Sequence, residues 1–206
     1  MLDHLVYAAP DLEAAVNELE QRLGVRPAPG GKHPQWGTKN FLLALGPKAY
    51  LEIIGPDPEA AAPAGPRPFG IDGSTEPRLA TWVARPAGGM DAAVANAKAA
   101  GYDPGPITDG RRERPDGVVL QWRLTPPNVS KGDGILPFLI EWGDCPHPAE
   151  STPKGCTLVD LRATHPEADV LQPILRALGT DLNVHYGDAA MLMAIIDTPN
   201  GRRELL

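Results

Sequence analysis

Two glutamates stand in parts of the sequence where a charged side chain is expensive to bury. Glu52 lies inside the apolar run 49–54, and Glu141 lies near the end of the apolar run 135–142. A carboxylate that is buried without a partner costs free energy, so each glutamate needs a cation nearby. That cation is either a metal ion or a basic side chain such as Arg78. Both glutamates are also candidates to move a proton in catalysis.

His4 is a third residue of this kind. It alternates with Val6 and Ala8, so on a strand it would share a face with small side chains, where its ring needs a partner. A histidine and two carboxylates suit a divalent ion, with water or substrate oxygens in the open positions. We therefore expect His4, Glu52 and Glu141 to hold Zn, Ni, Mn or Fe, unless an ion pair makes the metal unnecessary.

The glycine-containing loop 30–40 carries further candidates. His33 could be a catalytic base, a fourth metal ligand or a substrate contact, or it could only hold the loop by hydrogen bonds. Trp36, Thr38 and Asn40 would add an aromatic wall and polar contacts. We expect this loop to bind the substrate, with His33 in a catalytic role.

Three arginines flank the turn at 115–117. Arg112, Arg114 and Arg123 could hold a carboxylate or phosphate group of an acidic substrate by paired hydrogen bonds, or they could form a solvated surface cluster. We expect at least one of them to bind the substrate. Structural positions are expected for the remaining aromatic and histidine candidates: Trp122 and Trp142 in the core, His147 in a loop and His165 at a helix start.

The composition of the 206 residues limits the partners. A hydrophobic content of 42% suffices for a globular core, and a net charge of −7 gives no electrostatic reason to bind nucleic acid or an anionic membrane. The sequence contains no apolar stretch of ~20 residues and no leader-like start, so the expected location is the cytoplasm. Cys145 and Cys156 fit unpaired thiols in a reducing compartment. No Walker, GxGxxG, HExxH or GxSxG motif is present.

These candidates need elements to position them, and the hydrophobic pattern predicts the same order of elements three times. The first round has a strand at 4–9, a helix capped by Asp11 and ended by Gly24, and a hairpin of strands at 41–45 and 49–54, with room for another strand before it. A connector rich in proline, glycine and alanine follows at 55–77.

The later rounds repeat this order. The second has a strand at 79–84, a helix capped by Asp91 and stopped by Gly101, and strands within 117–124 and 135–142. The third has a strand at 157–163, a helix at 169–179 and strands at 191–196 and 202–206. Pro173 is expected in the first turn of the third helix, where its missing N–H does no harm.

The repeat predicts an α+β fold of βαβββ modules that form a cupped, half-barrel mixed sheet. We expect residues 1–144 to form one domain of two paired modules, at about 1–55 and 78–144, and residues 156–206 to form a third, partial module. His4, Glu52 and Glu141 would meet in the cup only if the first two modules pair about a pseudo-twofold axis.

Several motifs in this order resemble a known family. They are D-H-L-V-Y-A-A-P-D-L, G-G-K-H-P-Q-W-G-T-K-N, Y-L-E-I-I-G, R-P-D-G-V-V-L-Q-W-R-L and L-P-F-L-I-E-W, which run from Leu2 to Trp142. The sequence is similar here to glyoxalase-like domain proteins of the vicinal oxygen chelate superfamily. The resemblance implies paired βαβββ modules, often a divalent metal held in part by a histidine at the place of His4, and chemistry on an oxygenated small molecule. The sequence departs from it near Arg78 and Leu79, where metal-dependent members usually have a second histidine.

The expected function is a small-molecule enzyme, a lyase, isomerase or dioxygenase, in which Glu52, Glu141 or His33 moves a proton. The alternative is a metal-free protein that binds or sequesters a small ligand, as resistance proteins of this superfamily do, and the missing second histidine favours it. In a third interpretation the cup is vestigial and the third module is an assembly surface. Self-association into a homodimer stays open.

Overall fold

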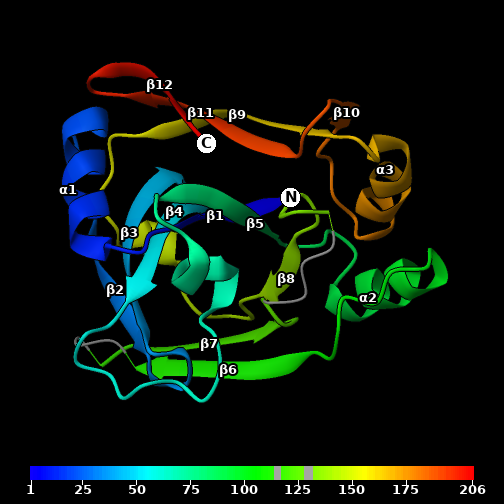
Figure 1. Ribbon diagram of the computed structural model, residues 1–206. Coiled ribbons are helices and arrows are strands. Elements are labelled where there is room, and N and C mark those ends of the chain that lie inside the picture. Colours follow the sequence, from blue (N-terminus) through cyan, green and yellow to red (C-terminus); the bar gives the residue numbers. More distant parts are fainter. Residues whose placement is uncertain (114–116, 128–131) are drawn as a thin grey trace. The chain divides into compact units, whose positions relative to one another are not determined.

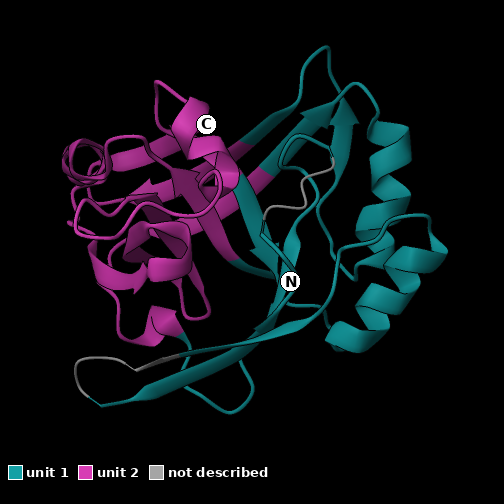
Figure 2. Cartoon of the chain, turned by 60° about the horizontal axis from the view of Figure 1, so that its bottom comes forward, with its two compact units in different colours: residues 1–3, 81–147, 162–192 teal, residues 4–80, 148–161, 193–206 magenta. Residues whose placement is uncertain are grey.

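The computed structural model describes residues 1–113, 117–127 and 132–206, with the backbone alone for residues 112 and 113. The chain divides into two compact units, shown in different colours in Figure 2. Unit 1 comprises Met1–Asp3, Thr81–His147 and Arg162–Leu192, and unit 2 comprises His4–Ala80, Pro148–Leu161 and Met193–Leu206. Each unit contains most of one of the first two predicted modules and part of the third. The predicted domain boundaries themselves stay a prediction.

The first module has the predicted order of elements, with the additional strand in place. Its elements are β1 (Leu2–Ala8), α1 (Leu12–Leu23), β2 (Ala28–His33), the 3₁₀ helix η1 (Pro34–Trp36), β3 (Thr38–Gly46) and β4 (Ala49–Pro56). The 3₁₀ helix η2 (Pro68–Gly73) lies in the connector. Asp11 caps α1 as predicted, because its Oδ1 accepts from the Ala14 N–H, and Gly24 ends the helix with φ +76°.

The two faces of the first module's sheet carry different side chains. β1 pairs with β4 in parallel, so that His4 lies opposite Tyr50 and Val6 opposite Glu52. Residues that alternate with these point the other way, and Tyr7 on that second face interacts with Arg22 of α1. The helix therefore covers the face with Tyr7, and the face with His4 and Glu52 is turned away from α1. The register confirms that His4 and Glu52 share a face.

The second module repeats the first. Its elements are β5 (Arg78–Ala84), α2 (Met90–Ala99), β6 (Thr108–Glu113), β7 (Val119–Leu124) and β8 (Phe138–Glu141). The prediction that Asp91 caps α2 is wrong, because the helix begins at Met90 with Gly89 as its N-cap and Asp91 lies in the first turn. The sequence did not predict β6, because T-D-G-R-R-E has no apolar alternation.

The third module has strand, helix and strands in the predicted order but a different pairing. Its elements are the preceding 3₁₀ helix η3 (Pro148–Glu150), β9 (Thr157–His165), α3 (Ala168–Ala177), β10 (Val184–Tyr186), β11 (Met191–Thr198) and β12 (Gly201–Leu205). The short strand β10 was not predicted, and it pairs with β9 in parallel. The prediction that Pro173 lies in the first turn is wrong, because it is the sixth residue of a helix that starts at Ala168 and therefore lies in the second turn.

The strand orders confirm the predicted fold class, an α+β fold of repeated βαβββ modules with mixed sheets (Figure 1). The larger sheet has the order β2-β3-β4-β1-β5-β8-β7-β6, in which each strand of the first module has a counterpart in the second. The pairs β1–β4 and β5–β8 are parallel, whereas β3–β4 and β7–β8 are antiparallel. The smaller sheet has the order β10-β9-β11-β12. No helix in the described part of the chain is long and apolar enough to cross a membrane.

Candidate functional site

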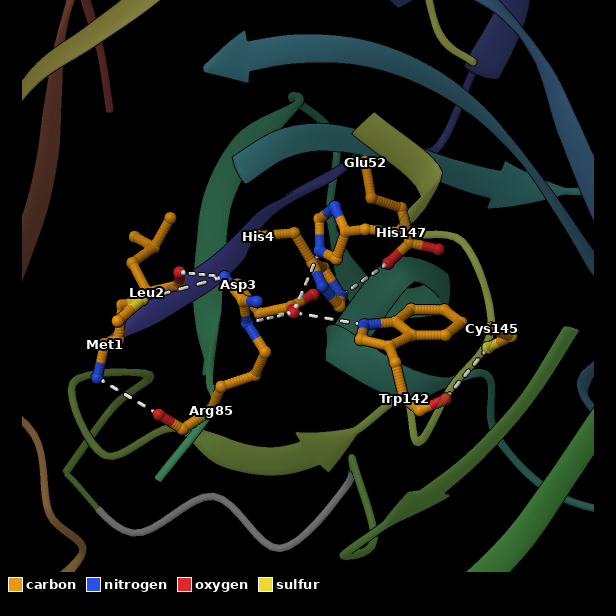
Figure 3. Close-up of polar contacts among 9 residues, drawn as sticks. All are labelled: Met1, Leu2, Asp3, His4, Glu52, Arg85, Trp142, Cys145 and His147. Atoms are coloured by element: carbon orange, nitrogen blue, oxygen red, sulfur yellow. Dashed lines mark hydrogen bonds and ion pairs between the residues drawn. The ribbon is translucent and has the colours of Figure 1, made fainter. Parts of the chain in front are cut away.

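Glu52 is a buried carboxylate in the middle of β4, and each of its oxygens has a different neighbour. The Asn40 side chain donates a hydrogen bond of 2.5 Å from Nδ2 to Oε1. Oε2 lies 3.6 Å from Nε2 of His4, and Figure 3 shows the two side chains pointing toward one another. At that distance the two groups are close without a direct hydrogen bond.

His4 is held rigidly beside this carboxylate. Its side chain is buried, and its ring stacks on Tyr50 with the ring centroids 4.4 Å apart and the planes at 16°. The stacking follows from the register, because His4 and Tyr50 are opposite residues of β1 and β4. The His4 ring therefore keeps its Nε2 directed at Glu52.

Asn40 joins this pair from β3. The backbone N–H of Gly31 donates to its Oδ1 at 2.6 Å, from a point where the pairing of β2 with β3 shifts register. At Gly30 a Cβ atom would lie 2.3 Å from the same oxygen, so only glycine fits. Asn40 was predicted to bind substrate, and the structure places its amide against Glu52.

The other loop candidates lie around the hairpin between β2 and β3. His33 ends β2, and its Nδ1 is 3.1 Å from the hydroxyl of the fully buried Thr38. Its ring lies 5.7 Å from that of Trp36 in η1. Arg67 of the connector donates to the carbonyl of Gly37 and fixes the hairpin from outside. The roles of His33, Trp36 and Thr38 in binding or catalysis stay predictions.

Glu141 has a different environment from Glu52. Arg123 on the neighbouring strand places Nη1 3.0 Å from its Oε2, and Asp91 of α2 accepts two bonds from the same guanidinium. Glu141 therefore points to the face of β7 and β8 that α2 covers. The hydrogen bond from Arg123 lowers the pKa of Asp91, and Asp91 in turn raises the pKa of Arg123.

The arginines that were predicted to bind substrate have different environments. Arg123 is engaged by two carboxylates, so any substrate anion would compete with them for it. Arg112 lies in β6, where its side chain is not described, and Arg114 lies outside the described residues. Arg78, the alternative cation for a glutamate, donates to the carbonyl of Phe69 at 2.6 Å.

Sequence reasoning missed a second buried carboxylate, Asp3. Its Oδ2 lies 2.8 Å from Nε of Arg85, accepts from the Trp142 indole at 3.0 Å and lies 3.1 Å from Nε2 of His147 (Figure 3). His147 lies in a loop, as predicted, and its side chain is buried there. The ring centroids of Trp142 and Trp122 lie 5.4 Å apart, and both side chains are half-buried rather than enclosed in the core.

The donor geometry of the first module suits two ligands of one metal ion. Two ligands bound at ~2.1 Å to a tetrahedral ion lie roughly 3.4 Å apart, and His4 Nε2 and Glu52 Oε2 are 3.6 Å apart. Among residues 1–113, 117–127 and 132–206, no group of three His, Cys, Asp or Glu side chains is arranged to hold a metal. The predicted set of His4, Glu52 and Glu141 stays a prediction.

Comparison with known proteins agrees with the fold. A crystal structure of a hypothetical protein from Staphylococcus aureus matches with a TM-score of 0.60 at 11% identity, over 92% of this chain and 87% of that chain. Methylmalonyl-CoA epimerase from Mycobacterium tuberculosis has a TM-score of 0.44 at 19% identity, over 69% of this chain and 87% of its own. No match was found among curated proteins. The family described as Glyoxalase-like domain matches residues 2–179, which confirms the resemblance seen in the sequence, and the chain belongs to that family.

Proposed function

We propose that the chain is a small-molecule enzyme of the glyoxalase-like type in which Glu52 moves a proton next to a carbonyl group, as a lyase or isomerase does. The observation that carries the proposal is the Glu52 carboxylate, which is buried with Oε1 anchored by Asn40 and Oε2 left beside His4. A carboxylate held in one orientation in a largely water-excluded site is suited to general base catalysis.

The proposed step is a simple proton transfer. Oε2 of Glu52 takes a proton from the carbon next to the substrate carbonyl, and the electrons of that C–H bond move onto the carbonyl oxygen to form an enolate. Return of the proton to the neighbouring carbon completes an isomerisation, whereas return to the same carbon from the same side restores the substrate. His4 borders Oε2 and would contact the bound substrate there.

If a divalent ion is bound, His4 Nε2 and Glu52 Oε2 would hold it, and the ion would supply polarisation of the substrate oxygen. Oε2 would then be a ligand instead of the proton acceptor, so the proton transfer described above belongs to the metal-free site. Glu141, the third ligand proposed from the sequence, would first have to exchange its Arg123 partner. With or without the ion, Asn40 would hold Oε1 and keep the carboxylate in its orientation.

The second candidate is a metal-free binding protein that uses the same residues to hold a ligand without reaction. The pairing of Glu141 with Arg123 favours it, because that pair neutralises the third proposed metal ligand. The two candidates differ in whether a bound compound exchanges protons with solvent.

The test is proton exchange in D₂O. The protein is incubated with a panel of small carbonyl compounds: an α-hydroxyketone, a 2-oxo acid, a hemithioacetal of a 2-oxoaldehyde and a 2-methyl-branched thioester. Mass spectrometry then follows deuterium uptake next to the carbonyl. Glu52→Gln should lower the exchange rate by ~10²–10⁴-fold. The matched control is Glu59→Gln, which changes an exposed glutamate and should leave the rate unaltered. If a compound binds saturably and none of the compounds exchanges its protons, the enzyme proposal is wrong and the second candidate, a binding protein, takes its place.

A further inference from the structure

The orientation of the Asn40 amide follows from its neighbours. The Gly31 backbone N–H can only donate a hydrogen bond, so the amide atom facing it must be the oxygen Oδ1. The nitrogen Nδ2 then faces Glu52 and can only donate. The oxygen of Glu52 that meets this donor is therefore an acceptor, and the contact fixes Oε1 in place.

The backbone is shaped to keep Asn40 in this place. The pairing between β2 and β3 shifts register between Pro29 and Lys32, which brings the Gly31 N–H over the Asn40 oxygen. Gly30 leaves the space that a side chain would take from that oxygen. A glycine inside a strand is costly, so its presence here marks a close approach that the site needs.

The two oxygens of Glu52 are consequently not equivalent. Oε1 is tied to β2 through Asn40, whereas Oε2 has His4 as its neighbour at a distance longer than a hydrogen bond. The oxygen with the weaker contact is the one available to a substrate proton.

We propose that Asn40 is a positioning residue that holds Oε1 of Glu52 and thereby makes Oε2 the proton-accepting oxygen. This inference rests on the proposed function of Glu52. It assigns Asn40 to the proton-transfer machinery rather than to substrate binding, and it connects the position of β2, which ends at His33, to the orientation of the base.

The first arm of the test is the pair of kinetic constants for the exchange of a reactive compound. Asn40→Asp keeps an oxygen for the Gly31 N–H but loses the donor to Oε1 of Glu52. The carboxylate is then no longer held in one orientation, so kcat should fall by ~10-fold or more, the scale of one charged hydrogen bond, while KM changes little. Asn17→Asp makes the same change at an exposed residue of α1 and should leave both constants in place. An unchanged kcat in Asn40→Asp would overturn the inference.

The second arm needs no activity. The side-chain amide signals of Asn40 in an NMR spectrum of the whole chain should shift in Glu52→Gln and stay in place in Glu59→Gln. If the signals respond but no compound exchanges, the contact stands and the proposed function fails. If exchange occurs but the signals ignore Glu52→Gln, the function stands and Asn40 has no part in it.

Discussion

At the scale of single residues, three polar side chains meet at the carboxylate of Asp3. Its carboxylate is fully buried and meets a guanidinium, an indole N–H and an imidazole at one oxygen. Removal of such a carboxylate leaves buried donors without an acceptor. Asp3 therefore acts on stability, because it joins the start of β1 to residues up to 144 positions away in the sequence.

We predict that Asp3→Ala lowers the free energy of unfolding by ~3 kcal/mol, because it removes a buried charged partner of Arg85 and of His147. Urea unfolding at neutral pH would measure the change. Asp181→Ala removes an exposed aspartate and should change stability by less than ~0.5 kcal/mol. Equal stability of the two variants would show that the Asp3 contacts contribute no net stabilisation.

The metal prediction also belongs to this scale. We expect wild-type protein purified without chelator to take up Zn²⁺ or Mn²⁺ in a calorimetric titration, and Glu52→Gln to take up neither. The variant should keep its melting temperature, because the neighbours of Glu52 are an amide and a histidine rather than a buried arginine. Metal uptake that survives Glu52→Gln would place the ion elsewhere.

The same rule, a carboxylate in an apolar run, finds Glu52 in the sequence and would have found Asp3. The rule could not predict that Glu52 and Glu141 have different environments. Both lie in apolar runs, but the face on which each side chain lies depends on strand register and on which helix covers that face. The partners of His147 were beyond prediction, because no local pattern links it to Asp3.

At the scale of elements, helix ends and hairpins follow local chemistry, whereas irregular strands depend on distant contacts. Asp11 and Gly24 bound α1 as their residue types predict. β6 escaped prediction because its residues are charged or glycine, and it forms by pairing with β7. Gly110 of that strand lies under the Trp122 ring, where a Cβ would lie 2.2 Å from an indole atom.

Gly30 gives the sharpest prediction about an element. Gly30→Ala should lower the free energy of unfolding by ~1–3 kcal/mol and displace Asn40, because the new Cβ would overlap its side chain. Gly65→Ala is the matched control, since a Cβ there meets nothing within 4 Å, and it should be neutral or slightly stabilising. Urea unfolding of both variants decides the point, and similar stabilities would mean that β2 moves freely enough to absorb a methyl group.

At the scale of the whole molecule, the residues of the third module are divided between the two units. In unit 2 the β11–β12 hairpin reaches the end of α1, where Asn200 donates to the carbonyl of Gln21 and Arg22 donates to the carbonyl of Glu204. The contact from Asn200 satisfies a carbonyl that the helix end leaves open, and the contact from Arg22 ties the helix to β12. The sequence predicted the elements of this module but not their partners, because contacts over 179 positions have no local signature.

Each of the two units contains a buried tyrosine whose raised pKa makes folding stability sensitive to alkaline pH. Burial raises the pKa of Tyr7 in unit 2 and of Tyr102 in unit 1, so the folded chain holds both phenolic protons more tightly than the unfolded chain. A raised pKa contributes stability that is fully present below the unfolded value of ~10 and is lost as pH rises through the folded value. Burial of Cys156 acts in the same direction from a lower starting pKa.

We therefore predict that the free energy of unfolding falls above about pH 10, by up to ~1.4 kcal/mol per pH unit for each tyrosine that ionises only on unfolding. Urea unfolding at about pH 8 and pH 11 would measure the loss, and tyrosinate absorbance should rise together with unfolding for the two buried phenols. The double variant Tyr7→Phe, Tyr102→Phe keeps both rings and removes both protons, so its stability should fall less steeply over the same interval. A loss as steep as in the wild type would assign the alkaline transition to other groups, because the two tyrosines would then contribute nothing to it.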